Sequence, residues 1–371
     1  MSHYKPSLSI LILAYNNCIY TKMCLNFLLR SIPEWVEVLV LNNGSTDGTF
    51  EYLRTINDAR VRIFRLEKNV GVSRGYNYLR TYISITSRWI VFLNNDILVE
   101  NEWCEQLVSE VETDRSIGIV GCKLIYPQTN QIQHAGVLFM LLEDKKEIRP
   151  FHFAFHEDPY SFLVSKPRDF PAVTGALLLT SVELFDRVGG WDEDYFLGCE
   201  DIDFCLKVLS LSKRIRYLPV PSAYHFHEVT VGQRPSTNKS RNLAIFNKKW
   251  AERVLREWPH FVQHSYWSPQ SRIQSLQSLI EEDKKRAVVF GTGSYAKYCI
   301  KTICDLGFKV VAFVDNDSRK WGKKFLNKLI CSPQQILEVQ PDVVIIASSN
   351  YKSIQEQLLL FVGDQVEIRN I

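Results

Sequence analysis

The sequence predicts an α/β protein with two separate sheet-containing domains. The chain has 371 residues, about twice the usual size of one domain, and 46% of them are apolar, which is enough for a buried core. Short apolar strands alternate with amphipathic helices over the first 120 residues and again from Arg286 onward. This alternation is typical of a mostly parallel sheet covered by helices.

Four strands are expected in the first region. They are Leu8–Leu13, Glu37–Leu41, Val61–Arg65 and Trp89–Leu93. Ligands of parallel sheets bind beyond the carboxyl ends of the strands. The residues that follow each strand are therefore the first candidates for a site.

The organisation changes after Asp114. The elements are mixed up to about Leu218, and the polar stretch Leu142–Arg168 predicts a mobile loop, followed by a helix over Asn238–Glu257. We expect a first domain over residues 1–260, a linker with a bridging helix over 261–284, and a second domain over 285–371.

Charge and cysteine content exclude several classes of protein. The net charge of +3, with both signs interspersed, does not indicate a nucleic-acid partner. Apolar stretches too short to span a bilayer and the absence of a signal pattern predict a cytoplasmic protein, with attachment to the inner face of the membrane left open. The nine cysteines lack Cys-x-x-Cys pairs, so we expect buried apolar residues and neither disulfides nor a zinc site.

Polar residues follow the first two strands. The first strand leads into Ala14-Tyr15-Asn16-Asn17, and the second into Asn42-Asn43-Gly44-Ser45. Such residues can turn the chain and offer hydrogen bonds to a nucleotide base and ribose. For either segment alone, an ordinary strand-to-helix turn is the alternative.

The third helix and the fourth strand add charged residues. The run from Asn69 to Asn77 opens the helix and contains Arg74, and helix N-terminal amides beside a basic side chain suit a diphosphate. The fourth strand ends in Leu93-Asn94-Asn95-Asp96, which delivers a carboxylate to the ligand-binding edge.

Together, these segments resemble the family-two glycosyltransferases of the GT-A fold, which bind nucleotide-diphospho-sugars. The resemblance implies that Asp96 is the last member of a DxD-type motif that holds Mn²⁺ or Mg²⁺ against the donor diphosphate. Hard divalent cations prefer such oxygen ligands. Asn42 and Asn94 depart from the family pattern, because Asp is frequent at both positions. The donor-binding residues implied by the resemblance are Tyr15, Asn16, Asn42, Asn43, Arg74, Asn77, Asn94, Asn95 and Gly175.

The middle of the chain strengthens the resemblance. It contains Gln133-His134-Ala135-Gly136 and Val173-Thr174-Gly175-Ala176. The run from Gly189 to Asp203 is similar to the family's Gly-Gly-Phe-Asp-Glu-x-Phe-Phe-x-x-x-Glu-Asp-x-Asp-Leu motif, with Trp191 in place of Phe. This is the most specific match in the chain.

The resemblance also implies the catalytic groups. An inverting transfer needs one carboxylate that removes the acceptor proton. By position this base is Asp201, with Glu200 orienting the acceptor; the alternative is that these acids only favour a helix N-terminus. A histidine in this region can complete the metal site in the family, so we expect His227, with His225 as the second choice.

The last region is predicted to be a small Rossmann-like domain. Gly291-x-Gly293-x-x-Ala296 follows a strand, and Asp315 ends the next one, as in a dinucleotide fingerprint without its third glycine. It also resembles the nucleotide-sugar-binding N-terminal domain of bacterial sugar acetyltransferases. Three roles stay open: a scaffold, a nucleotide or nucleotide-sugar site at Gly291, Gly293 and Asp315, and NAD-dependent catalysis, for which no Tyr-x-x-x-Lys set follows.

The expected function is the metal-dependent, inverting transfer of a hexosyl or deoxyhexosyl group to an acceptor hydroxyl. We expect a UDP-sugar donor, with dTDP as the alternative because Leu-Asn-Asn-Asp also occurs in rhamnosyltransferase-like members. The acceptor would be a glycan, a lipid-linked glycan or a protein, in bacterial surface glycan or glycoprotein assembly. Two other functions stay open: a non-catalytic nucleotide-sugar-binding protein and a sugar-modifying NAD-dependent oxidoreductase. Homo-oligomerisation is also left open.

Overall fold

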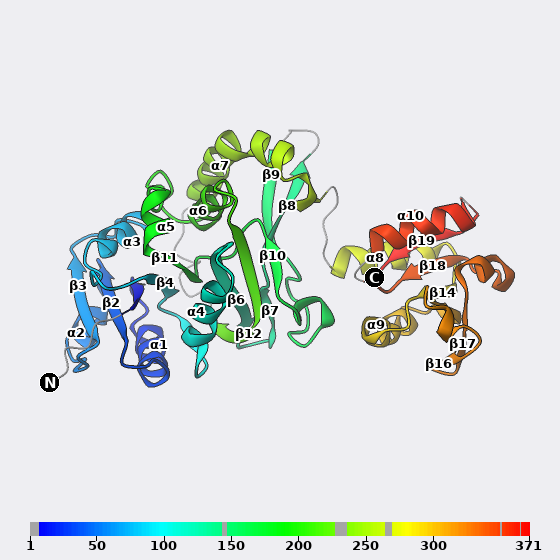
Figure 1. Cartoon of the computed structure of the whole chain (residues 1–371), viewed down its shortest axis with the longest axis horizontal. Helices are drawn as coiled ribbons and strands as arrows, with labels where there is room; N and C mark the ends of the chain where they lie inside the picture. Colours follow the sequence, from blue (N-terminus) through cyan, green and yellow to red (C-terminus); the bar gives the residue numbers. More distant parts are fainter. Residues whose placement is uncertain (1–6, 143–146, 227–235, 264–268, 349–350, 364) are drawn as a thin grey trace. The chain divides into compact units, whose positions relative to one another are not determined.

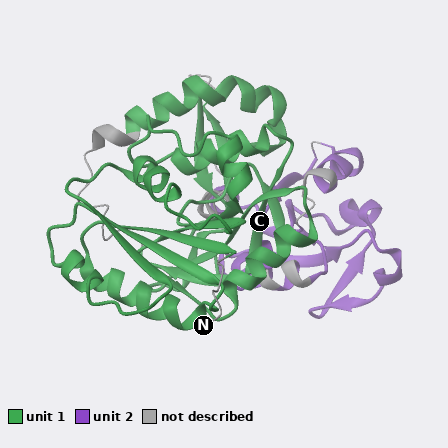
Figure 2. Cartoon of the chain, turned by 60° about the vertical axis from the view of Figure 1, so that its left-hand side comes forward, with its two compact units in different colours: residues 1–159, 166–265 green, residues 160–165, 266–371 purple. Residues whose placement is uncertain are grey.

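The computed structural model describes residues 7–142, 147–226, 236–263, 269–348, 351–363 and 365–371. The chain divides into two compact units, residues 1–159 with 166–265, and residues 160–165 with 266–371 (Figure 2). The short segment of the second unit contains the 3-10 helix η1 (Phe162–Val164). Because each unit has its own sheet and core, each is described by itself.

The first unit is built on a large mixed sheet (Figure 1). Its elements are β1 (Leu8–Ala14), α1 (Cys18–Ser31), β2 (Val36–Asn43), α2 (Thr49–Leu53), β3 (Val61–Leu66), α3 (Val72–Arg80), β4 (Trp89–Asn94), β5 (Ile97–Val99), α4 (Trp103–Thr113), β6 (Ile117–Tyr126), β7 (Gln131–His134), β8 (Val137–Leu142), β9 (Glu147–His152), β10 (Arg168–Phe170), β11 (Leu177–Ser181), α5 (Val182–Arg187), α6 (Glu200–Leu209), β12 (Arg214–His225), α7 (Ser236–Glu257), the 3-10 helix η3 (Pro259–Phe261) and β13 (Val262–Gln263).

The four predicted strands of the first region are confirmed as β1, β2, β3 and β4. The sheet order is β10-β12-β6-β11-β4-β1-β2-β3, with β5 beside β12 and β7 beside β6. Strands β3, β2, β1 and β4 are parallel, whereas β11 runs antiparallel to both β4 and β6. The carboxyl ends of the parallel strands therefore lie at one edge of the sheet, where ligands are expected.

Strands β1 and β2 are apolar on both faces because helices cover both sides of the sheet. Ile10 and Ile12 face one core, which includes side chains of α1 and α4. Leu11 faces the other core, to which α3, α6 and α7 contribute. Successive residues of a strand point to opposite faces, so a run of apolar residues is needed to fill both cores.

The predicted mobile loop over Leu142–Arg168 is wrong in part. Of this stretch, 147–152 form β9, which pairs antiparallel with β8 in a separate three-stranded sheet together with β13. The backbone of Ile148 is held by Asn247 of α7, with its N–H donating to Asn247 Oδ1 at 2.7 Å and its carbonyl accepting from Nδ2 at 3.0 Å. This contact joins residues 99 apart in the sequence, so local polarity could not reveal the strand.

The second unit has a smaller, mostly parallel sheet of order β16-β17-β15-β14-β18-β19. Its elements are α8 (Pro269–Glu281), β14 (Arg286–Phe290), α9 (Ser294–Asp305), β15 (Lys309–Val314), the 3-10 helix η4 (Ser318–Lys320), β16 (Lys324–Phe325), β17 (Lys328–Cys331), the 3-10 helix η5 (Pro333–Val339), β18 (Val343–Ile346), α10 (Tyr351–Val362) and β19 (Glu367–Asn370). Only β16 and β17 pair antiparallel.

One helix expected in the second unit is absent from the described residues between β15 and β18. A hairpin and the 3-10 helix η5 take its place. The hairpin turns through Leu326 and Asn327, which both have positive φ, the geometry of a two-residue turn that matches the twist of its strands. Of the predicted linker 261–284, Val262–Gln263 belong to the first unit as β13, and α8 belongs to the second.

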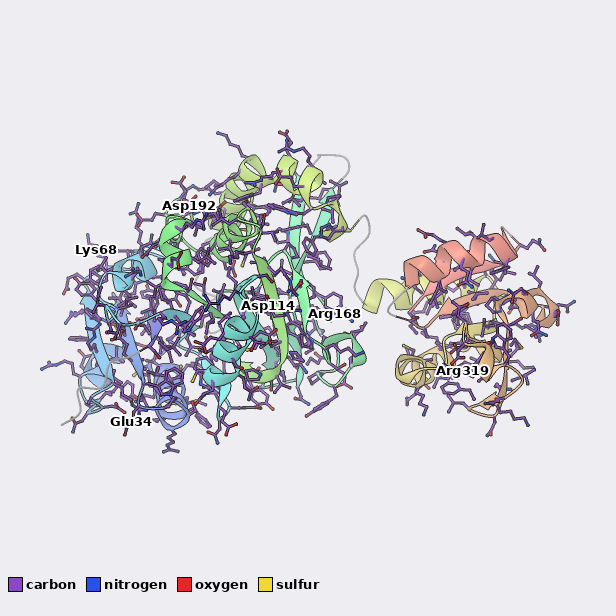
Figure 3. The ribbon with its side chains drawn as sticks, viewed as in Figure 1. Glu34, Lys68, Asp114, Arg168, Asp192 and Arg319 are labelled. Atoms are coloured by element: carbon purple, nitrogen blue, oxygen red, sulfur yellow. The ribbon has the colours of Figure 1, made fainter. Side chains whose placement is uncertain are left out.

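Two cysteines of the first unit, Cys24 and Cys122, are buried. Burial raises the pKa of each thiol to about 12, which suits an apolar role. None of the helices in the described ranges is both long and apolar enough to cross a membrane. Charged side chains of both signs cover the surface of the first unit (Figure 3), where for example Arg214 Nη1 lies 2.7 Å from the carboxylate of Asp114.

Candidate functional site

The loops after β1 and β2 are joined by hydrogen bonds. The N–H of Asn16 donates to Ser45 Oγ at 2.9 Å, and the N–H of Thr46 donates to Asn16 Oδ1 at 2.8 Å. Asn16 has a positive φ of 54°, which asparagine adopts more readily than most residues. Tyr15, directly after β1, is half-buried beside this contact. The two predicted donor-binding loops therefore form one continuous surface.

Asn43 at the end of β2 shapes the turn before α3. Its Nδ2 donates to Asn69 Oδ1 at 3.1 Å and to the carbonyl of Gly71 at 3.2 Å, and its Oδ1 accepts from the N–H of Val70 at 3.1 Å. The neighbouring Asn42 is buried, and its Oδ1 has no hydrogen-bond partner among the described residues. Both polar atoms of the Asn43 amide therefore bind the turn, whereas the Oδ1 of Asn42 does not.

The N-terminus of α3 contacts the loop that precedes α6. The N–H of Val72 donates to the carbonyl of Phe196 at 2.9 Å. A Cβ at Gly71, which has φ +87°, would lie 2.7 Å from that carbonyl oxygen, so a glycine is required. The predicted diphosphate segment and the Gly189–Asp203 motif are therefore in direct contact.

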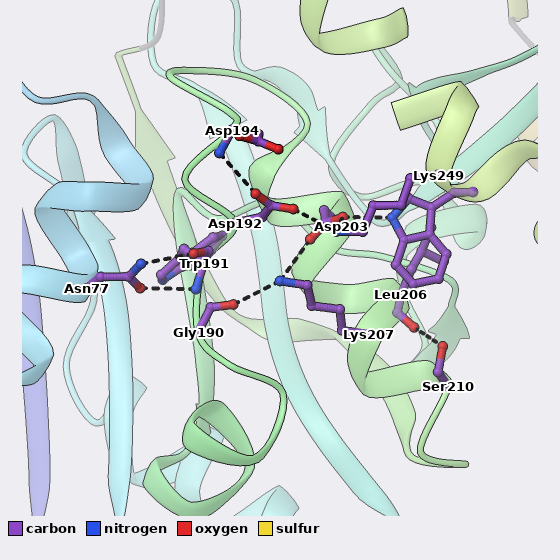
Figure 4. Close-up of polar contacts among 11 residues, drawn as sticks. Asn77, Gly190, Trp191, Asp192, Asp194, Asp203, Leu206, Lys207, Ser210 and Lys249 are labelled. Carbon is purple, nitrogen blue, oxygen red and sulfur yellow. Dashed lines mark hydrogen bonds and ion pairs between the residues drawn. The ribbon is translucent and has the colours of Figure 1, made fainter. Parts of the chain in front are cut away.

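Asn77 forms a second connection between these segments (Figure 4). Its Nδ2 donates to the carbonyl of Trp191 at 2.9 Å and to Glu193 Oε1 at 3.0 Å, and its Oδ1 accepts from the N–H of Trp191 at 3.1 Å. Arg74 Nε lies 3.3 Å from Glu193 Oε2, although the Arg74 side chain is largely exposed. Asn77 thus uses its whole amide on the protein, while Arg74 faces solvent and only shares a surface ion pair.

At the end of β4, Asp96 and His225 meet. Asp96 Oδ1 lies 3.1 Å from Nε2 of His225, which ends β12, and both side chains are mostly buried. Asn94 Nδ2 is 3.4 Å from the same His225 nitrogen, and Asn95 Nδ2 donates to Thr21 Oγ1 at 2.8 Å. Of the expected residues, Asp96, Asn94 and the second-choice His225 are brought together, whereas His227 lies outside the described residues.

Gln133 determines which nitrogen of His225 carries a proton. Gln133 Nε2 donates to the His225 carbonyl at 3.2 Å, so its Oε1 faces His225 Nδ1, with which it forms a hydrogen bond. Because an amide oxygen only accepts, Nδ1 must be protonated. In the neutral imidazole, Nε2 then presents its lone pair to the Asp96 carboxylate.

A lone pair and a carboxylate oxygen 3.1 Å apart are two acceptors that face each other. A cation or a proton between them would remove the repulsion, and carboxylate oxygen with imidazole nitrogen is a common ligand pair for Mn²⁺. Among the described residues no group of three or more His, Cys, Asp or Glu side chains could hold a metal. The described chain thus offers two ligands, and the remaining ones would come from elsewhere.

Asp201 lies in the first turn of α6, and two backbone amides hold its carboxylate. Oδ2 accepts from the N–H of Gly175 at 2.9 Å, and Oδ1 accepts from the N–H of Ile202 at 2.9 Å. Burial raises the pKa of the Asp201 carboxyl above its ordinary value, although these two amides lower it. A Cβ at Gly175 would lie 3.1 Å from the Asp201 Cβ. Gly175 therefore supports Asp201 directly.

A short chain of contacts connects Asp201 to Asp96. Gly175, which binds Asp201, precedes Ala176, whose carbonyl accepts from the N–H of Asn94 at 2.9 Å. The phenol of Tyr76 donates to the carbonyl of Leu93 at 3.3 Å, and burial, and then the charges of Glu200 and Asp96, raise its pKa. Glu200 itself is buried at the start of α6. This chain of contacts connects the predicted base to the strand that precedes the predicted metal ligand.

Asp203, two residues after Asp201, has a structural role. It is fully buried, its Oδ1 accepts from Trp250 Nε1 at 2.7 Å and lies 2.5 Å from Lys249 Nζ, and its Oδ2 lies 3.2 Å from Lys207 Nζ. Lys249 also reaches Asp192 at 2.7 Å (Figure 4). This cluster anchors α6 and the preceding loop to α7.

In the second unit, Gly291 begins the turn between β14 and α9. Its φ is +115°, and a Cβ there would lie 2.6 Å from the carbonyl oxygen of Ala347. Gly293 precedes the first residue of α9, and no atom would crowd a Cβ there. The Asp315 carboxylate accepts from Thr292 Oγ1 and from Lys320 Nζ, the latter at 2.9 Å. A ribose hydroxyl at Asp315 would therefore compete with protein partners.

Three residues near the site, Gln133, His134 and His152, had no role in the sequence-based expectations. Gln133 and His134 belong to a recognised motif, but the motif gives no indication that Gln133 directs the His225 ring. His152 lies in the stretch predicted as a loop, and its contact with His134 depends on the pairing of β8 with β9. His134 ends β7 and His152 ends β9, which belong to different sheets, so no local pattern signals this contact.

Comparison with protein families gives two matches. Residues 9–166 match the family model described as "Glycosyl transferase family 2". Residues 283–368 match the model described as "C2185-like, N-terminal". The first range includes Asp96 and ends before Asp201 and His225.

Similar proteins include two bacterial transferases. Rhamnosyltransferase WbbL of Escherichia coli K12 is 40% identical over 149 residues, which is 37% of this chain and 52% of that protein. N-acetylglucosaminyl-diphospho-decaprenol L-rhamnosyltransferase of Mycobacterium tuberculosis is 23% identical over 222 residues, 55% of this chain and 70% of that protein. The chain spans from 14% to 52% of the length of four curated matches, of which WbbL is one.

A solved structure, GalNAc-T7 with UDP, GalNAc and Mn²⁺, is similar to the first part of the chain in fold. It is 17% identical, has a TM-score of 0.52, and the match covers 69% of this chain and 49% of that one. At this identity the similarity concerns the fold alone.

Proposed function

We propose that this chain is an inverting, metal-dependent glycosyltransferase. The proposal starts from the match of residues 9–166 to glycosyltransferase family 2 and from the α/β GT-A-type fold. The protein would transfer a sugar from a nucleoside diphosphate to an acceptor hydroxyl. The observation that carries the proposal is the contact path from the Asp201 carboxylate through Gly175, Ala176 and Asn94 to the Asp96–His225 pair. This path supports the proposal that a base and a cation-binding pair share one site.

Asp201 is the proposed base. As the acceptor oxygen forms its bond to the anomeric carbon, the hydroxyl proton moves to a carboxylate oxygen of Asp201, and the bond between the anomeric carbon and the diphosphate oxygen breaks. The Gly175 and Ile202 amides fix the direction of the carboxylate. Burial raises its pKa, which makes the carboxylate a better proton acceptor than an exposed aspartate. Glu200, the preceding residue on α6, would orient the acceptor.

Asp96 and His225 are the proposed metal ligands, because their facing acceptor atoms fit a cation. A bound Mn²⁺ or Mg²⁺ would neutralise negative charge on the departing diphosphate. GalNAc-T7, whose structure has the same type of fold, contains Mn²⁺ and UDP. His227 stays a prediction for a further ligand.

The donor would bind over the loops after β1, β2 and β4. Asn16 and Asn43 hold these loops in shape, so Tyr15, the amide of Asn42 and the exposed Arg74 are the side chains we propose for direct contact with the donor. Asn94 and Asn95 would border the metal. We propose a UDP-sugar, with dTDP-linked deoxyhexoses as the alternative, because two rhamnosyltransferases are among the similar proteins.

The acceptor and the place of action are also proposals. A matched protein from Myxococcus xanthus is named for O-antigen biosynthesis, and the chain aligns with 14% of its length. A glycan, lipid-linked or protein acceptor in bacterial surface glycan assembly, handled at the cytoplasmic face of the membrane, is consistent with these relatives.

A donor screen tests the proposed function. Full-length protein is incubated with UDP-, dTDP- and GDP-sugars, with Mn²⁺, with Mg²⁺ or with EDTA, and free nucleoside diphosphate is measured. We expect release from one donor class in the presence of metal and none in EDTA. Release that is unaffected by EDTA would reject the metal-dependent mechanism, and no release from any donor would favour a non-catalytic nucleotide-sugar-binding protein.

The variant Asp201→Asn sharpens the test. The amide keeps the size of the side chain but cannot take up the acceptor proton, so transfer should fall by a factor of about 10² or more while donor and metal still bind. Donor affinity is measured by calorimetry. The control is Asp203→Asn, because Asp203 joins α6 to Lys249 and Trp250 of α7. This variant should lower thermal stability but leave the rate per folded molecule close to that of the wild type. Near-normal transfer by Asp201→Asn would reject the assigned base.

For the second unit we propose a nucleotide or nucleotide-sugar site at Gly291, Gly293 and Asp315 on a Rossmann-like sheet. The unit's mostly parallel sheet and the required glycine at position 291 support this proposal. Calorimetric titration with UDP, UDP-sugars and NAD⁺ would test it, using Asp315→Asn as the matched variant. Equal affinity in both proteins would favour a scaffold role.

A further inference from the structure

His134 is fully buried and has a defined pattern of hydrogen bonds. Its Nε2 accepts from two backbone amides, the N–H of Gly136 and the N–H of Thr174, each at 3.3 Å. Because both partners are donors, Nε2 must carry a lone pair and no proton. The proton of the neutral ring is therefore on Nδ1.

His152 of β9 completes this arrangement. His134 Nδ1 lies 2.9 Å from His152 Nδ1, so the protonated nitrogen of His134 donates to the unprotonated nitrogen of His152 (the rings cross nearly at right angles, 86°). The acceptor at His152 keeps the His134 proton on Nδ1. Burial, followed by the influence of the other histidines, lowers the pKa of both rings, which keeps them neutral.

The amide that His134 binds lies next to the amide that binds Asp201. The N–H of Thr174 points to His134 Nε2, and the N–H of the following Gly175 points to Asp201 Oδ2 at 2.9 Å. The next carbonyl, that of Ala176, accepts from Asn94 in the strand that leads to Asp96. Successive peptide groups of this turn are thus directed to the imidazole, to the carboxylate and to the neighbouring strand.

We propose that His134, kept in one tautomer by His152, is a positioning residue that holds the Thr174–Gly175 turn so that its amide orients the Asp201 carboxylate. The inference rests on the proposed function of Asp201 as the base. His134 does not touch the substrate. It fixes the peptide whose N–H the base accepts, and a base displaced by about 1 Å can lose a factor of about 10² in rate.

Two amide side chains separate this role from simple packing. In His134→Gln the side-chain oxygen can occupy the place of Nε2 and accept from the Thr174 amide, whereas in His134→Asn the shorter side chain reaches only the place of Nδ1, toward His152. Both variants are neutral, polar and smaller than histidine. A packing role predicts equal effects, and a positioning role predicts that only the glutamine variant keeps its rate.

The experiment measures transfer by the full-length protein and these variants, with the donor found in the screen. We expect His134→Gln to stay within about threefold of the wild-type kcat and His134→Asn to lose about 10- to 100-fold, with the donor KM unchanged in both. Equal kcat values for the two variants would overturn the inference. Thermal unfolding identifies a variant that has failed to fold.

The His152 pair provides an independent test that avoids changes at His134. His152→Asn can still accept from His134 Nδ1 and should keep its rate. His152→Leu leaves the buried Nδ1–H of His134 without an acceptor, so the ring should shift from its place and kcat should fall by about tenfold or more. Equal rates for the two His152 variants would contradict the role of His152 in holding the His134 ring.

Crystal structures of the His134 variants test the inference without activity. We expect the contact between Gly175 N and Asp201 Oδ2 to persist in His134→Gln and to lengthen beyond hydrogen-bonding distance in His134→Asn. Persistence of the contact in His134→Asn would overturn the inference. If the wild-type protein releases no nucleoside diphosphate, the proposed function fails, and this distance still decides whether His134 positions the turn.

Discussion

At the residue scale, the site depends on hydrogen bonds that define protonation states. Gln133 directs the proton of His225 to Nδ1, which leaves Nε2 facing Asp96. Hydrogen bonds from backbone amides define the same tautomer for His134, with the proton on Nδ1 and the lone pair on Nε2, but there the lone pair is directed to the Thr174 amide. The side chain of His225 is therefore suited to bind a cation, whereas that of His134 is suited to hold the backbone.

The Asp96–His225 pair gives a prediction on metal binding. Replacement Asp96→Asn removes the negative charge and keeps the size of the side chain, so Mn²⁺ affinity, measured by electron paramagnetic resonance of the free ion, should fall about tenfold or more. The surface variant Asp114→Asn, which changes the ion pair with Arg214 and the hydrogen bonds from Ser116, should bind Mn²⁺ as the wild type does. Unchanged affinity in Asp96→Asn would exclude this residue as a ligand.

The neutral His152 gives a prediction on stability and pH. Burial lowers its pKa to about 4, whereas an unfolded histidine has a pKa of about 6.5. Between these values the unfolded chain binds more protons than the folded one, so stability is lost as pH falls from about 6.5 to about 4. A non-titrating His152→Asn variant should lose about 3 kcal/mol less than the wild type between pH 7 and pH 4.

Urea unfolding at each pH, followed by fluorescence, measures this difference. His156→Asn serves as the control because His156 is exposed, and it should follow the wild-type curve. Parallel curves for His152→Asn and the wild type would show that His152 does not titrate as its environment indicates.

At the element scale, helix α3 and the loop before α6 act as one part of the site. Val72 at the start of α3 binds Phe196, and Asn77 in its middle binds Trp191 through both atoms of its amide. Trp191 in turn packs against Phe204 of α6 with ring centroids 5.0 Å apart. The donor-side helix and the helix that carries Asp201 are therefore positioned against each other through one loop.

The contact between the Asn77 amide and the Trp191 backbone can be tested by substitution. Asn77→Ala removes hydrogen bonds to the Trp191 backbone and leaves partly buried polar groups without their partner, so we expect a loss of about 1 to 3 kcal/mol in unfolding free energy together with a lower kcat. Arg80→Ala on the same helix breaks only a surface ion pair with Asp186 and should cost less than about 1 kcal/mol. Equal losses of unfolding free energy in the two variants would mean that the Asn77 contacts do not hold α3 against the loop before α6.

At the scale of the whole molecule, the residues of the proposed glycosyltransferase site are all in the first unit. Its last strand, β13, pairs with β8, and Val262 is buried in the core that also contains Phe246 and Trp250 of α7. The first unit therefore needs residues up to at least Gln263. A boundary at residue 260 would remove β13.

Two truncations test this boundary. A protein ending at residue 265 should fold alone and keep release of nucleoside diphosphate, whereas one ending at residue 260 should be destabilised, because removal of buried Val262 alone costs about 1.5 kcal/mol or more. Circular dichroism, thermal unfolding and the donor assay compare them with the full chain. A well-folded 1–265 protein without donor hydrolysis would show that the second unit completes the site.

The sequence by itself determined the elements and residues that depend on local pattern. Apolar runs such as Ile10–Ile12 predicted β1 because a strand covered on both faces must be apolar on both. The order of motifs led to family 2, which the match over residues 9–166 supports, and to Asp96 and Asp201 as candidates. The prediction of β1 is confirmed because periodicity acts between residues close in the chain, whereas the roles of Asp96 and Asp201 stay predictions.

The tertiary structure alone decided what depends on contacts between distant segments. Strand β9 exists because β8 and Asn247 satisfy its backbone, and no local pattern in that polar stretch shows this. His134 binds His152, 18 positions away, and His225 binds Gln133, 92 positions away, so the same residue type has two different surroundings and two different roles. The sequence does not show which groups will form a hydrogen bond, because the partner of a donor or acceptor is decided only when folding brings the two within about 3 Å.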